Sequence, residues 1–90
     1  MVKIERINTT NALRVFDNSD EWEVLISYST PVALYTQENG VSITSKYYSV
    51  TTTKHIKKWL TSKGIDMKEA NTTDPDSIHE FLLKKLARDF

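Results

Sequence analysis

The first half of the chain alternates between apolar and polar positions with a period of two, which is typical of β-strands. The clearest run, residues 22–28, places four large side chains on one face: Trp22, Val24, Ile26 and Tyr28. Further strands are predicted at residues 2–8, 12–17, 32–35 and 41–48, separated by turn-forming residues at 9–11, 18–20 and 38–40. These segments predict about five antiparallel strands in meander order.

In the second half, apolar residues recur at helical spacing. A first helix is predicted to begin at an N-cap, either Ser49 or one of the threonines at 51–53, and to end at Gly64. Its buried side is predicted to consist of Ile56, Trp59 and Leu60. A second helix is predicted to begin at Asp74-Pro75-Asp76, with an apolar stripe of Ile78, Phe81, Leu82, Leu86 and Phe90. Residues 65–73 are predicted to be a loop from which Ile65 and Met67 reach the core.

These elements predict an α+β fold in one domain, residues 1–90: a meander sheet of about five antiparallel strands, with both C-terminal helices packed on one face. The other face is then expected to be exposed to solvent or to meet a partner. Several apolar side chains are expected there: Leu13, Val15, Leu25 and either Leu34 or Tyr35. They are either scattered surface residues or a surface for self-association, which makes a homodimer an expectation.

Composition limits the classes of protein that remain. The 90 residues contain no cysteine, which excludes disulfides, thiolate catalysis, zinc fingers and iron–sulfur clusters. The N-terminus lacks the apolar segment of a signal peptide, and no apolar run reaches the roughly 20 residues that span a bilayer. A cytoplasmic protein with no membrane partner is therefore expected.

The net charge of zero hides three unlike segments. Residues 1–40 contain three basic and six acidic residues, residues 41–63 contain five basic and none acidic, and residues 64–90 contain four and six. The first helix thus has a basic side formed by Lys54, Lys57 and Lys58. This side is a solvated helix face, a docking site for an acidic protein, or a nucleic-acid contact.

No pattern in the chain indicates catalysis. His55 and His79 lie on different predicted helices without a metal-ligand companion, and His55 is expected to be exposed or half-buried beside the lysines. A glycine-rich phosphate loop and a nucleophile elbow are both absent. We therefore expect no enzyme activity, no cofactor, no metal and no small-molecule substrate.

Two adjacent tyrosines, Tyr47 and Tyr48, are predicted at the end of the fifth strand, where neighbouring side chains point to opposite faces. One of them must therefore lie away from the face that the other packs against. Tyrosine is enriched among the residues that dominate interface energies, so Tyr48 is a candidate contact.

Two segments resemble a known family. They are residues 29–35 (Ser-Thr-Pro-Val-Ala-Leu-Tyr) and 47–60 (Tyr-Tyr-Ser-Val-Thr-Thr-Thr-Lys-His-Ile-Lys-Lys-Trp-Leu), and they resemble small tailed-phage proteins of unassigned function. The resemblance covers roughly residues 24–60 and does not reach the C-terminal helix. Thr53 and Lys57 depart from it, since serine and asparagine are frequent there.

The resemblance implies a phage accessory protein, made in the cytoplasm of an infected bacterium, and it brings no catalytic residues. Such proteins commonly bind a host protein, so the leading hypothesis is an inhibitor or modulator of a bacterial anti-phage defence system of the restriction or BREX type. The predicted partner-binding residues are the basic helix residues and Tyr48 together with an acidic stretch: Lys54, Lys57, Lys58, Tyr48, Asp20, Glu21 and Glu23. The alternative is a nucleic-acid-binding accessory protein that uses the basic helix, residues 51–63.

Overall fold

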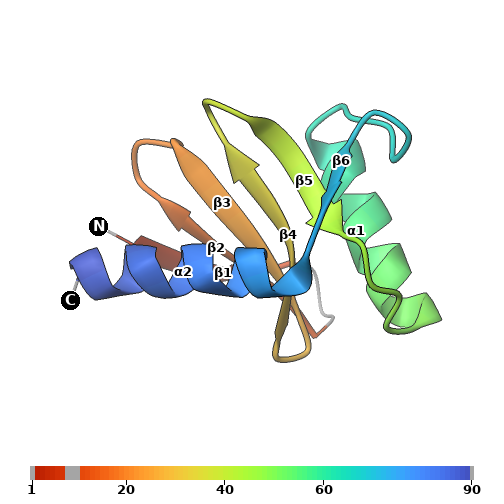
Figure 1. Ribbon diagram of the computed structural model, residues 1–90, viewed down its shortest axis with the longest axis horizontal. Coiled ribbons are helices and arrows are strands. Elements are labelled where there is room, and N and C mark those ends of the chain that lie inside the picture. The colour runs from red at the N-terminus through yellow and green to blue at the C-terminus, as the bar shows by residue number, and fades with distance from the viewer. Residues whose placement is uncertain (1, 8–10, 90) are drawn as a thin grey trace.

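A six-stranded sheet with one helix on each face forms the protein in a computed structural model that describes residues 2–7 and 11–89 (Figure 1). Five strands form the predicted antiparallel meander: β1 (Val2–Arg6), β2 (Ala12–Asp17), β3 (Trp22–Ser27), β4 (Thr30–Thr36) and β5 (Gly40–Thr44). The strands lie in the sheet in chain order, so β1 forms one edge and β6 (Asn71–Thr73) the other. The α+β class and the meander are therefore confirmed.

The short strand β6 was predicted to be loop. It pairs with β5 in parallel, with Ile43 opposite Thr72. A parallel pair needs a crossover connection, and helix α1 (Val50–Ser62) supplies it. Asn-Thr-Thr shows no alternation of apolar and polar residues, so this strand depends on the position of α1 rather than on its own sequence.

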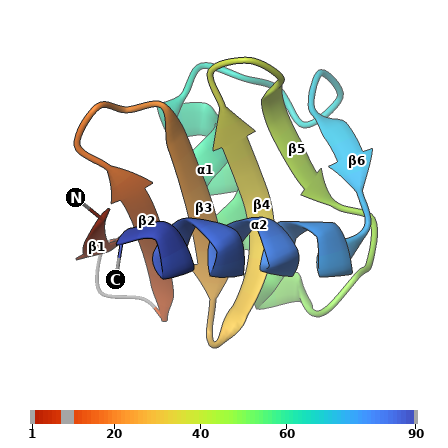
Figure 2. The ribbon, with the colours of Figure 1, turned by 60° about the vertical axis from the view of Figure 1, so that its left-hand side comes forward.

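The expectation that both helices share one face is wrong. Figure 2 shows α1 behind the sheet and α2 (Pro75–Asp89) in front of it. Each helix covers its own apolar cluster. The α1 core consists of Ala12, Leu25, Val32, Ala33, Val41, Ile43, Ile56, Trp59 and Leu60. The α2 core consists of Val15, Trp22, Val24, Ile78 and Leu82.

Strand β3 gives the physical reason for this arrangement. Alternation sends Trp22 and Val24 into the α2 core, and it sends Leu25 into the α1 core, where it is fully buried. Three consecutive apolar residues, 24–26, are typical of a strand that is covered on both faces. Leu25 and Val15, which were expected on an uncovered face, therefore lie under opposite helices.

The local signals at the helix ends are confirmed. The N-cap of α1 is Ser49, whose Oγ accepts a hydrogen bond from the backbone N–H of Thr52 at 3.1 Å. Gly64, just beyond the helix, has a φ of +71°. Asp74 Oδ1 accepts from the backbone N–H of Asp76 at 3.3 Å at the start of α2. The predicted turn residues 9–10 and Phe90 lie outside the described residues.

The fifth strand is shorter than predicted, because β5 ends at Thr44. There the Thr44 Oγ1 accepts a hydrogen bond from the backbone N–H of Lys46 at 3.2 Å, which turns the chain toward α1. Tyr47 and Tyr48 therefore lie in a connection and not on opposite faces of a strand, which corrects the prediction. Tyr28 was predicted as the last residue of its strand, but β3 ends at Ser27 and Tyr28 lies in the following turn with a φ of +60°.

Candidate functional site

Beneath α1, strand β3 carries an acidic side chain, Glu23, that is 6% exposed. Alternation along β3 aims Glu23 at the α1 side, because its neighbours Trp22 and Val24 face α2. A buried carboxylate is costly unless it is paired and hydrogen-bonded. Its position therefore requires donors from neighbouring elements.

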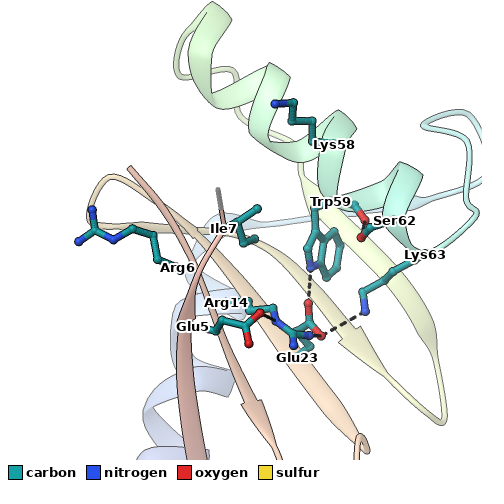
Figure 3. A pocket seen from close by; sticks show the side chains of 9 residues that line it. All are labelled: Glu5, Arg6, Ile7, Arg14, Glu23, Lys58, Trp59, Ser62 and Lys63. Atoms are coloured by element: carbon teal, nitrogen blue, oxygen red, sulfur yellow. Dashed lines mark hydrogen bonds and ion pairs between the residues drawn. The ribbon is translucent and has the colours of Figure 1, made fainter. Parts of the chain in front are cut away.

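Three donors converge on Glu23, as Figure 3 shows. Arg14 Nη1 of β2 lies 3.1 Å from Glu23 Oε1, and Lys63 Nζ, just beyond α1, lies 3.2 Å from the same oxygen. The Trp59 indole N–H donates to Oε2. Arg14 Nε also lies 3.0 Å from Glu5 Oε1 on β1. We call these five residues, Glu5, Arg14, Glu23, Trp59 and Lys63, the Glu23 cluster.

Electrostatics within the Glu23 cluster favour the charged state of Arg14. Partial burial by itself would lower the pKa of Arg14, but the hydrogen bond that Arg14 donates to Glu5 and the charges of Glu23 and Glu5 outweigh it and raise that pKa. Lys63 Nζ also lies 4.9 Å from the centre of the Tyr35 ring and 5.1 Å from the centre of a Trp59 ring. Arg14 and Lys63 are thus both held in place by carboxylates, and Lys63 also lies against two aromatic side chains.

A surface hollow of about 540 Å³ opens beside the Glu23 cluster, between β1 and the C-terminal half of α1. We call it the α1 hollow. Its lining residues are Glu5, Arg6, Ile7, Arg14, Glu23, Lys58, Trp59, Ser62 and Lys63. Four of them are basic and two are acidic, and both acids are paired with Arg14. Arg6 and Lys58 point away from the cluster in Figure 3, and neither forms an ion pair with a residue that the structure describes.

The three predicted lysines of the basic helix share one exposed side of α1. Lys54, Lys57 and Lys58 are spaced three and four residues apart, which places them on the same helix face, and all three are exposed. Lys58 also lines the α1 hollow. We call these three lysines, with Arg6 across the hollow, the α1 basic surface.

The other predicted contacts do not join this surface. Glu23 was predicted to contact a partner, but it is buried and paired with Arg14 and Lys63, so its carboxylate is not available to one. Asp20 is exposed in the β2–β3 turn and lines a second hollow that borders the Glu23 cluster. Glu21 is exposed too, but it lines a different hollow with Phe81 of α2. The acidic stretch is therefore divided between two sides of the molecule.

Tyr48 is half-buried and packs against the α1 core. Its ring lies 5.1 Å from Lys46 Nζ. Its neighbour Tyr47 is the more exposed of the two, at 68%. A contact through Tyr48 would therefore use only part of its ring, because the rest packs against the α1 core.

A second polar cluster under α1 contains His55. This residue was predicted to be exposed or half-buried, but it is buried, with 6% of its surface exposed. Ser27 Oγ lies 2.8 Å from His55 Nδ1 and 2.9 Å from Thr52 Oγ1. Burial, and then the positive charge of Lys58, lowers the pKa of His55. Ser27 is also buried, at 2%, so its hydroxyl cannot meet a substrate. The Ser27–His55 pair attaches α1 to β3 and is not an accessible nucleophile.

Sequence analysis did not identify Arg6, Arg14 or Lys63 as site residues. Arg14 lies between apolar residues on β2, and this alternation was the available signal that it faces the α1 side. Its contact with Glu23 joins residues from different strands, and that contact depends on strand register. Among the described residues, no group of three or more histidines or carboxylates could hold a metal ion, and no helix is long and apolar enough to cross a membrane.

Comparison with known proteins identifies a family but no described activity. Residues 2–76 match the model of a family of unknown function, DUF8033. The match spans all six strands and α1 and stops at the first turn of α2. No curated protein and no solved structure matches the chain.

Proposed function

The chain belongs to the DUF8033 family of unknown function, and we propose that it is a non-catalytic interaction protein whose α1 basic surface binds an acidic protein. The observation that carries this proposal is the imbalance of charge around the α1 hollow. Arg14 and Lys63 are held by carboxylates, whereas Arg6 and Lys58 have no ion-pair partner among the described residues. Lys54 and Lys57 continue the same positive surface along α1.

Mixed charge in the hollow favours a protein over a nucleic acid as the partner. The exposed Glu5 lies in the α1 hollow with the four cations, and its carboxylate would repel a nearby phosphate. An acidic protein surface can instead place its own carboxylates next to Arg6 and Lys58 and its donors next to Glu5. Arginine is also the better reader of bases and phosphates, whereas the exposed side of α1 carries lysines.

The resemblance of residues 29–35 and 47–60 to small tailed-phage proteins suggests the class of partner. We therefore propose a bacterial host protein, with a component of an anti-phage defence system of the restriction or BREX type as the first candidate. On this proposal the protein acts in the cytoplasm of an infected bacterium and inhibits or modulates its target by occupying a surface.

The test is capture from bacterial lysate with a matched pair of charge-reversal variants. One variant carries Lys57→Glu and Lys58→Glu on α1, and the control carries Lys68→Glu and Lys84→Glu, two exposed lysines outside the α1 basic surface. Both change the net charge equally, and thermal unfolding checks that both fold. We expect wild type and control to retain one stoichiometric protein that the α1 variant loses.

Two outcomes would contradict the proposal. One is wild-type protein that retains no stoichiometric partner, and the other is a partner that both variants retain equally. Retention of nucleic acid, followed by a mobility shift that weakens steeply with salt and is lost in the α1 variant, would establish the nucleic-acid alternative instead.

A further inference from the structure

The free edge of β1 carries a charge pattern that is complementary to itself. Its five residues are Val2, Lys3, Ile4, Glu5 and Arg6, and among the described residues β1 pairs only with β2. If two copies of β1 pair antiparallel with Ile4 opposite Ile4, then Lys3 of each copy lies opposite Glu5 of the other. We propose that β1 is a self-association edge and that its partner is a second copy of this chain.

The backbone N–H and carbonyl groups that β1 directs to its open edge are the ones that this pairing requires. The Ile7 N–H donates to the Ala12 carbonyl at 2.9 Å, so Ile7 and Ala12 form a hydrogen-bonded pair of β1 and β2. Such pairs alternate along an antiparallel ladder, which makes Glu5–Arg14 and Lys3–Phe16 the next bonded pairs. The N–H and carbonyl groups of Ile4 consequently face the open edge.

The pairing of β2 with β3 independently supports the same arrangement of backbone groups. The Tyr28 N–H donates to the Asn11 carbonyl at 2.7 Å, which makes this pair a hydrogen-bonded one. Leu13 and Val15 then direct their backbone groups to β3, and Arg14 directs its own to β1. Pairing of β1 with itself about Ile4 would therefore form hydrogen-bonded pairs at Ile4 and between residues 2 and 6.

The two faces of this edge also match a second copy. On the α2 side, Ile4 is 65% exposed although its cross-strand neighbour Val15 belongs to the α2 core. Pairing would place one Ile4 beside the other and cover both. On the α1 side, Glu5 is bound to Arg14 at 3.0 Å, and Lys3 of the second copy would extend this into a row of alternating charge.

Charges on an edge strand usually prevent association with other strands. Here they select one partner, because a strand of uniform or apolar character would offer Lys3 no carboxylate and would leave Glu5 with Arg14 alone. Pairing through five residues also buries less area than a typical stable interface, so we expect a micromolar equilibrium between monomer and dimer. Arg6 of the α1 basic surface and Glu5 of the α1 hollow belong to β1, whereas Lys54, Lys57 and Lys58 lie on α1. The inference is argued from the β1 edge alone and does not rest on the proposed function.

Charge-swap complementation tests the inference. Position 3 of one copy faces position 5 of the other, so Lys3→Glu places a carboxylate opposite Glu5 of the second copy. Glu5→Lys likewise places a lysine opposite Lys3 of the second copy. Each variant alone should dimerise about tenfold more weakly or worse. An equimolar mixture of the two variants pairs opposite charges at both positions, so it should recover the dimer. Sedimentation at high micromolar concentration measures the mass against the 10.4 kDa of one chain.

A second measurement does not depend on the fold of the variants. Amide hydrogen exchange of the wild type should show protection of Ile4 that rises with protein concentration, whereas Glu5, bonded to β2, should be protected at every concentration. Wild-type protein that remains monomeric at high micromolar concentration would overturn the inference. So would a mixture that fails to recover the dimer from folded variants, or an Ile4 amide whose protection is independent of concentration.

Discussion

Glu23 shows how one residue combines a structural cost with a structural role. Its carboxylate lies under α1 and accepts hydrogen bonds from Arg14, Trp59 and Lys63, which come from β2, α1 and the residue after α1. The pairing compensates the loss of hydration, and it ties the C-terminal end of α1 to the sheet. At the residue scale, the charged groups of the Glu23 cluster that border the α1 hollow are therefore held by contacts that also stabilise the fold.

Replacing Glu23 by glutamine should lower the free energy of unfolding by about 2–3 kcal/mol, because Arg14 and Lys63 would lose their shared anion while the shape of the side chain is kept. Chemical denaturation measures this change. Glu21→Gln is the matched control, since Glu21 is exposed just before β3 begins. It should change the free energy of unfolding by less than about 0.5 kcal/mol. Equal effects of the two substitutions would contradict this account of Glu23.

His55 should make stability depend on pH. Its pKa is lowered in the folded protein, so the unfolded chain binds a proton at a higher pH than the folded protein does. The stability that neutral His55 contributes is fully present above pH 6.5, the ordinary pKa of histidine. It is lost as the pH falls from there toward the lower pKa of His55 in the folded protein. Thermal unfolding between pH 8 and pH 5 should show a decline that His55→Gln reduces. His79→Gln, at an exposed position of α2, should keep the wild-type decline.

At the scale of elements, α1 is specified by its ends as much as by its apolar side. Ser49 caps its first turn, and Gly64 follows its last residues with a positive φ. The exposed side that carries Lys54, Lys57 and Lys58 contributes little to packing, so its composition is free to serve a partner. Helix stability and the proposed binding thus depend on different residues of α1.

Removal of the N-cap should therefore destabilise α1 without changing its basic side. Ser49→Ala should cost about 1 kcal/mol, because the Thr52 N–H would lose its acceptor. Ser49→Asp keeps an acceptor at the same position and should restore most of the loss. Urea denaturation followed by circular dichroism compares the three proteins. An alanine variant as stable as the wild type would show that Ser49 is not an effective cap.

At the scale of the whole molecule, the two apolar clusters share the central strands. Strand β3 contributes Leu25 to the α1 core and Val24 to the α2 core. Loss of packing in one cluster would therefore disrupt the strands that support the other. Each cluster also contains one tryptophan, Trp59 on the α1 side and Trp22 on the α2 side. The protein is therefore expected to unfold in one cooperative transition.

Two single-tryptophan variants test this cooperativity. Trp22→Phe leaves Trp59 to report on the α1 core, and Trp59→Phe leaves Trp22 to report on the α2 core. Within each variant, denaturation followed by fluorescence and by circular dichroism should give coincident curves. Ile78→Ala, placed in either background, should destabilise the protein by about 2–5 kcal/mol and so shift that transition to lower denaturant. Separate transitions for the two clusters would contradict the prediction.

The strands and helix ends could be predicted because their signals are local. Alternation over residues 22–27, the cap at Ser49 and the start of α2 at Asp74 each depend on neighbours in the chain. Tyr47 and Tyr48 were placed on a strand because alternation continues past Thr44, although a turn closed by Thr44 Oγ1 ends β5 there. A periodic pattern indicates which residues can form a strand, but pairing decides where the strand ends.

By itself, the sequence determined the α+β class, the meander, both helices and the basic side of α1, because apolar periodicity, caps and charge are properties of short segments. Only the tertiary structure decided that the helices cover opposite faces, that β6 joins the sheet, and that Glu23 meets Arg14, Trp59 and Lys63. Those contacts join residues far apart in the chain, and their formation depends on strand register and on the path of the crossover. The site therefore emerges from packing, whereas its charged residues are already visible in the chain.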